Sequence, residues 1–214
     1  FARNDGNGNY GSVMLDLDVL NPTGMTINSL DVHASTVVQT CNLDMYVRQG
    51  TYNNFWSNPE EWVLVGTATG TSSGVSNTPF NVIFNSPVYL PPGISGVKFH
   101  HRDFYCSYTT GTGTVTFSNA DVAMTVGHSQ YTSATNAFTG STLSPRWFAG
   151  TIYYETLNIS GNAQTGNYGP GCAGALGVPG LTASATPAIG TAVTLTIDNM
   201  AAPEIGILLM GLNH

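Results

Sequence analysis

The sequence predicts an all-β protein in which a jelly-roll-like β-sandwich is followed by a small, incomplete β domain. Apolar and polar residues alternate with a period of two along most of the first 157 residues, a pattern typical of strands buried on one face. Turn-forming residues recur between these segments at short intervals, as they do in sandwiches and jelly rolls. Helical signals are confined to residues 58–62, where a proline and two acidic residues fit one helical turn.

The strands follow one another along residues 1–157, which we take as the sandwich domain. The first covers residues 12–20, where every second residue from Val13 to Val19 is apolar. An Asn-Pro-Thr-Gly turn then leads into a second alternating segment. After the first, the expected strands cover residues 25–33, 43–48, 62–68, 78–84, 97–104, 113–118, 121–126 and 151–157.

The character of the chain changes after the sandwich. Residues 158–180 are rich in Gly, Asn and Pro and are predicted to be a linker. The remaining residues, 181–214, form a small β segment that a partner completes or that has been truncated. Its three expected strands cover residues 181–186, 191–199 and 205–212.

Composition indicates a secreted protein, extracellular or on the cell surface. Charged residues make up only 8% of the chain, against about 25% in a typical soluble domain. The surface must therefore consist largely of Thr, Ser, Asn and Gly, which is common in secreted β-proteins. The chain begins at Phe1 rather than Met, so we expect a processed product whose signal peptide has been removed.

Charge excludes two classes of partner. The net charge is −7 and the five basic residues are scattered, so no basic patch is available for nucleic acid or for an anionic membrane. No apolar run approaches the roughly 20 residues needed to span a bilayer, so membrane insertion is not expected.

The three cysteines fit no zinc-binding spacing. Cys41 and Cys106 both lie next to strand segments of the sandwich domain, and we expect them to form a disulfide in an oxidising environment. Closing a loop of this length would stabilise the fold by roughly 4 kcal/mol in the chain-entropy model. Cys172 is left over, either free or bonded to another subunit.

Several short motifs occur in a set order along the chain: MLDL at 14–17, LDMYVR at 43–48, GTY at 50–52, EWVLVGTA at 61–68, LPPG at 90–93, SPRWFAGTIYYE at 144–155 and YGPGC at 168–172. Together they resemble a module that recurs in large extracellular proteins of environmental bacteria, over about residues 1–212. The resemblance implies an extracellular jelly-roll-like domain followed by a smaller β domain, with no assigned function and no catalytic residues. In that family the Gly-Pro-Gly-Cys segment opens a longer domain with a later cysteine, which this sequence does not contain.

One candidate metal site precedes the first long strand. Asp5, Asn7 and Asn9 place oxygen ligands at alternate positions, as calcium loops do. An EF-hand would also need a bidentate Glu at the twelfth position, where Asp16 stands. The alternative is a Gly/Asn turn, which commonly leads into a strand. Calcium is the only cofactor that the sequence suggests.

Two pairs of polar residues are of the types that act in catalysis, but neither pair predicts an enzyme. Asp16 and Asp18 share one face of a strand, which is typical of its solvent side, whereas glycosidases place two carboxyl groups across a cleft. His101 and Asp103 would share a face of a strand, but no serine or cysteine motif marks a nucleophile for them.

One loop is rich in aromatic residues. Tyr52, Phe55 and Trp56 form the only set that looks exposed, and flat rings of this kind stack on sugars. A glycan-binding site is one interpretation, and the other is that these rings anchor the loop to the fold.

The last expected strand is apolar on both faces, as strands buried on both sides are. At a free edge it would pair with another strand, so we expect self-association by β-strand addition between identical subunits. The residues assigned to this contact are Ile205, Ile207, Leu208, Leu209, Met210 and Cys172.

These observations favour a non-enzymatic extracellular structural or adhesive protein, a self-assembling subunit of a filament or coat. The alternative is a carbohydrate-binding module of a secreted protein.

Overall fold

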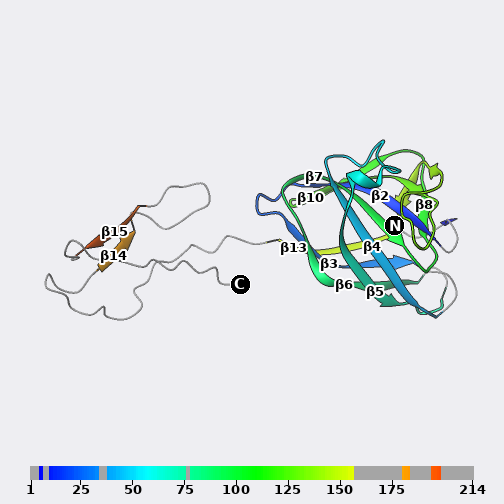
Figure 1. Ribbon diagram of the computed structural model, residues 1–214, viewed down its shortest axis with the longest axis horizontal. Coiled ribbons are helices and arrows are strands. Elements are labelled where there is room, and N and C mark those ends of the chain that lie inside the picture. The colour runs from blue at the N-terminus through cyan, green and yellow to red at the C-terminus, as the bar shows by residue number, and fades with distance from the viewer. Residues whose placement is uncertain are drawn as a thin grey trace. The chain divides into compact units, whose positions relative to one another are not determined.

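The chain divides into two compact units, Phe1–Leu157 and Asn158–His214. The division falls where the sequence analysis ends the sandwich domain. The computed structural model describes residues 5–6, 10–33, 38–75, 78–156, 180–183 and 194–198 (Figure 1).

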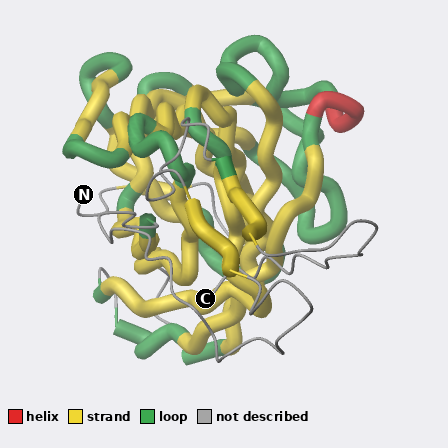
Figure 2. Tube along the Cα trace, turned by 90° about the vertical axis from the view of Figure 1, so that its left-hand side faces the viewer, coloured by secondary structure: helices red, strands yellow, loops and turns green. Residues whose placement is uncertain are grey.

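Strands account for nearly all regular structure, which confirms the all-β, sandwich-like fold (Figure 2). The one helix among the described residues is a single 3-10 turn, Pro59–Glu61, within the segment that the sequence assigned to a helical turn. The strands of the first unit are β1 (Asp5–Gly6), β2 (Gly11–Val19), β3 (Met25–His33), β4 (Thr40–Gln49), β5 (Val63–Thr71), β6 (Pro79–Leu90), β7 (Gly93–His101), β8 (Ser107–Thr110), β9 (Val115–Ser118), β10 (Val122–Gln130), β11 (Thr142–Leu143), β12 (Arg146–Phe148) and β13 (Gly150–Glu155).

One antiparallel sheet of ten strands builds the first unit. Its order is β11-β10-β2-β7-β4-β5-β6-β3-β13, with β9 also paired to β10. The sheet curls, so that β10, β2 and β7 lie in one layer and β6, β3 and β13 in the other, with β4 and β5 connecting them in the order of the sheet (Figure 1). A jelly roll keeps its two sheets separate. Here the β4–β5 and β5–β6 pairings join the layers into one sheet.

The layers are joined on one side and open on the other. The order of the sheet places β4 and β5 at the joined side. The two layers end at β13 and at β10, whose outer edge pairs with the short strands β9 and β11. The chain also crosses between layers at the turn after β2. There the Asn21 side-chain oxygen accepts a hydrogen bond from the Thr23 amide, and Gly24 adopts a positive φ of 79° that favours glycine.

The hydrophobic core lies between the layers. The predicted inward face of the first strand is correct, because Val13, Leu15, Leu17 and Val19 are at most 2% exposed. The other strands of both layers contribute further buried side chains, among them Ile27, Leu30, Leu43, Met45, Val82, Val97 and Phe99.

Two smaller sheets complete the described structure. β1, β8 and β12 form a three-stranded sheet that the sequence did not predict, because these strands are too short to show alternation. In the second unit, β14 (Gly180–Ala183) and β15 (Leu195–Asp198) pair antiparallel and overlap the first two strands expected there, with Gly180 coming from the expected linker. The third, residues 205–212, lies outside the described residues.

Candidate binding cleft and a second core

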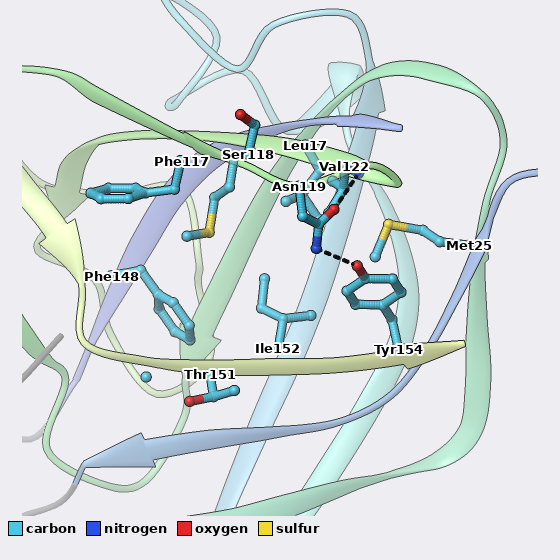
Figure 3. Close-up of a pocket in the computed structure, with 12 residues that line it drawn as sticks. Leu17, Met25, Phe117, Ser118, Asn119, Val122, Phe148, Thr151, Ile152 and Tyr154 are labelled. Atoms are coloured by element: carbon cyan, nitrogen blue, oxygen red, sulfur yellow. Dashed lines mark hydrogen bonds between the residues drawn. The ribbon is translucent and has the colours of Figure 1, made fainter. Parts of the chain in front are cut away.

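A cleft of about 300 Å³ lies at the open side of the sandwich (Figure 3). Leu17, Met25 and Phe148 are almost fully buried, and the exposed Thr151 is on the edge strand β13. Ligand-binding pockets typically have volumes of about 300–1,000 Å³ and mainly apolar walls. The lining residues are Leu17, Met25, Phe117, Ser118, Asn119, Val122, Met124, Phe148, Gly150, Thr151, Ile152 and Tyr154.

Polar groups of the cleft are few and uncharged. The Asn119 side-chain amide donates a 2.7 Å hydrogen bond to the Tyr154 hydroxyl, from the β9–β10 turn to β13 (Figure 3). The Asn119 side-chain oxygen accepts from the backbone amides of Asp121 and Val122, which fixes its orientation. None of the twelve lining residues is charged, so the cleft suits an uncharged, largely apolar occupant.

The cleft adjoins a strand edge. β13 pairs with β3 through six residue pairs and is the last strand of its layer. Along it, Gly150, Ile152 and Tyr154 are half-buried toward the cleft, whereas Thr151, Tyr153 and Glu155 are exposed. A strand edge beside an apolar cleft offers backbone hydrogen bonds and side-chain pockets together, the two requirements for binding an added strand.

A second hydrophobic core lies on the outer face of the β2–β7–β4 layer, under the loops at residues 50–62 and 131–141. Met14, Tyr52 and Trp62 are buried there, and the partly buried rings packed against them are Tyr46, Trp56 and Phe138.

Lys98 is buried in the second core with its ammonium group fully hydrogen-bonded. Its Nζ donates to the carbonyl oxygens of Trp56 at 2.7 Å and Ala137 at 2.9 Å, and to Gln130 Oε1 at 2.8 Å. It also lies 4.3 Å from the ring centroid of Phe138. Lys98 thereby ties both loops to the sheet.

Two physical effects act on Lys98 in opposite directions. Burial lowers its pKa to about 7, because removal from water disfavours the charged amine. The three oxygen acceptors favour the charged form, since a neutral amine has only two N–H donors. The ion pairs of the described residues are Arg48–Glu61 and Arg102–Asp44, so Lys98 takes part in neither.

The aromatic residues proposed for glycan binding do not form an open platform. Tyr52 is only 3% exposed, and its hydroxyl lies 2.7 Å from His128 Nδ1. Trp56 is half-buried and stacks on His128, while the Arg48 guanidinium lies over the Phe55 ring at 3.7 Å. The expectation that all three are exposed is wrong, because the loop folds back onto the sheet.

Asp16, one of the two aspartates on the first long strand, holds a loop in place. Asp16 accepts hydrogen bonds from the Thr51 hydroxyl at 2.6 Å and the Tyr52 amide at 2.8 Å. It therefore fastens the start of the aromatic loop.

His101 and Asp103 do not form a pair of the kind that orients a catalytic base. His101 is buried, its Nδ1 lies 3.4 Å from the Tyr105 carbonyl oxygen, and its ring stacks on Phe104. Asp103 instead accepts hydrogen bonds from the backbone and side-chain amides of Asn42. Burial lowers the pKa of His101 to about 3, so the ring is neutral near pH 7.

The expected disulfide is not formed in this structure. Cys41 and Cys106 are both buried free thiols. The Cys41 thiol donates a weak hydrogen bond to the Gln39 carbonyl oxygen at 3.6 Å, and burial raises the pKa of both thiols. The structure thus assigns both cysteines to the hydrophobic core between the layers.

The remaining predicted residues lie wholly or partly outside the described part of the chain. Asp5 belongs to β1 by its backbone, which pairs with Tyr108, and Asn7 and Asn9 lie outside the described residues. The residues assigned to subunit contact also lie outside it: Ile205, Ile207, Leu208, Leu209, Met210 and Cys172.

Sequence reasoning missed both the cleft and Lys98. The alternation over residues 151–157 indicated a strand, but nothing local marked that strand as the end of a layer. The only available signal for Lys98 was its rarity, since it is the single lysine of the chain and lies within an expected strand.

Comparisons with known proteins add no relative: no family model matches the chain, and no curated protein matches it. Within the described ranges, no three His, Cys, Asp or Glu residues are grouped closely enough to hold a metal ion. The described part of the chain also contains no helix that is both long and apolar enough to cross a membrane.

Proposed function

We propose that this chain is a non-enzymatic, extracellular structural or adhesive module that self-associates by strand pairing at the cleft. The observation that carries the proposal is the position of β13, which ends its layer and borders an apolar cleft without charged lining residues. A contact of this type joins different surfaces of two copies, and such head-to-tail contacts build filaments when they do not close into rings. Secretion is supported by the low content of charged residues, 8% of the chain.

Light scattering over a concentration series tests this function on the full chain. We expect the mean mass to rise with concentration, and Phe117→Asp to lower it by placing a charge in the cleft, which the half-exposed Phe117 ring lines. Ile83→Asp is the matched control, because Ile83 is 62% exposed on β6 and does not line the cleft. A wild-type chain that stays monomeric across the series would refute self-association.

Carbohydrate binding is the second candidate. Phe55 and Trp56 remain half-exposed in one loop with three exposed asparagines, and amide groups hydrogen-bond readily to sugar hydroxyls. A glycan array with the wild-type chain and Trp56→Ala tests it, since specific binding must be present in the first and lost in the second. Wild-type protein that binds no glycan rules this candidate out. The asparagines are Asn53, Asn54 and Asn58.

A further inference from the structure

The cleft sets requirements for the strand that pairs with β13. β13 has six residues, so an added strand of similar length spans about 20 Å at 3.3 Å per residue. One face of that strand would point into the apolar cleft, and the other would lie beside the exposed residues Thr151, Tyr153 and Glu155. The occupant must therefore be extended, and uncharged and apolar on the face that enters the cleft.

Residues 205–212 meet these requirements. Their sequence, Ile-Gly-Ile-Leu-Leu-Met-Gly-Leu, contains six large aliphatic side chains and no charge in eight residues. In an extended conformation Ile205, Ile207 and Leu209 would share one face, and Leu208 and Met210 would share the other. The segment is therefore long enough to pair along the six residues of β13, and whichever of its faces enters the cleft is apolar.

We infer that residues 205–212 of a second copy of this chain lie in the cleft as a strand beside β13. The inference rests on the proposed function and names the partner of that same site. Each copy carries one cleft and one such segment, and the segment belongs to a different compact unit from the cleft, so the first unit keeps all its own strands when a second copy supplies the added one. When two copies bind in this way, one cleft and one segment of the pair remain unoccupied. Further copies can therefore bind through the same contact.

Two variants of the full chain separate the two halves of this contact. The tail variant carries Ile207→Asp and Leu208→Asp, which place a charge on each face of the strand whichever face enters the cleft. The cleft variant carries Phe117→Asp, with Ile152→Asp as a second version in case one substitution disturbs the fold. Each variant must show the wild-type circular dichroism spectrum and thermal transition before its mass is compared.

We expect each variant alone to be monomeric by light scattering and an equimolar mixture of the two to form a one-to-one dimer. The mixture contains one intact cleft and one intact segment, so association must stop at two copies. A tail variant that associates like wild type, while the cleft variant does not, would overturn the assignment of residues 205–212 and leave the proposed function standing. Association that survives in both variants would overturn the proposed function itself, and a monomeric wild type would overturn both.

Discussion

At the scale of single residues, Lys98 is the most unusual feature of the first unit. It is 0% exposed and is the only lysine of the chain. Buried cations are normally paired with carboxylates, because desolvation of an unpaired charge is costly. Lys98 instead binds the carbonyl oxygens of Trp56 and Ala137 and the Gln130 side chain, so its role is to hold two loops against one sheet.

Substituting Lys98→Met should destabilise the fold and loosen both loops. Methionine keeps an unbranched apolar side chain, but three oxygen atoms lose the donor of their hydrogen bond. Each of these acceptors that stays buried without a partner destabilises the fold by about 1–3 kcal/mol. Urea denaturation should therefore show a loss of about 3 kcal/mol or more. Arg102→Met is the comparison, since it also removes a cation, but one whose side chain is 40% exposed and makes a single ion pair, so it should cost less than Lys98→Met. A Lys98→Met protein as stable as wild type would contradict this role.

His101 should make the fold sensitive to acid. Burial lowers its pKa from 6.5 to about 3, so between these values the unfolded chain binds a proton that the folded chain does not. The free energy of unfolding should therefore fall as the pH drops through this window, by up to about 1.4 kcal/mol per pH unit from this residue. Urea denaturation between about pH 7 and pH 4 measures the slope. His101→Phe, which keeps a ring against Phe104, should reduce it, and an unchanged slope would show that His101 does not contribute.

At the scale of elements, the aromatic loop packs on β7 because of one glycine. A Cβ atom at Gly96 would lie 2.6 Å from the Tyr52 backbone nitrogen, closer than non-bonded atoms approach. The loop can contact the strand there only if the position carries no side chain.

Gly96→Val should push this loop away from the sheet. We expect the free energy of unfolding to fall by about 1–3 kcal/mol and Trp56 to become more exposed to solvent. Thermal unfolding measures the first effect, and tryptophan fluorescence measures the second. Gly113→Ala is the matched control, because a Cβ at Gly113 has no neighbour within 4 Å. An unshifted melting temperature in Gly96→Val would mean that the loop does not depend on this approach.

The strands were predictable where one face is buried and the other is not. β2 and β3 follow the expected alternation closely, because the period of two is imposed by the pleat itself. Strand order was not predictable, since it depends on pairings such as that of β3 with β13, whose residues are more than 100 positions apart. The burial of Tyr52 was missed for a related reason: its contacts with Asp16 and His128 come from distant strands and leave no local pattern.

At the scale of the whole first unit, the two sides of the sandwich differ in how they are held. On the joined side, β4 connects the layers by pairing with both β5 and β7. On the open side, the described hydrogen bonds across the cleft are between side chains: Asn119 donates to the Tyr154 hydroxyl, and that hydroxyl donates to Asp121 at 3.5 Å. The sequence could therefore predict that strands contribute to the candidate site. It could not predict where the cleft lies, because that depends on the order in which all the strands pair.

The position of β13 also has a mechanical consequence. The chain leaves the first unit from β13, so tension from the following residues is applied to a strand held by six residue pairs with β3 alone. β2, in contrast, is held by nine pairs with β7 and eight with β10. Stretching a single molecule from its two ends should therefore peel β13 first, as a small step at low force before the main rupture. A second strand paired with the other edge of β13 would resist this peeling, so an assembled fibre should be stiffer at this point than an isolated subunit. A force–extension curve of the single molecule with one rupture only would contradict the expectation that β13 detaches first.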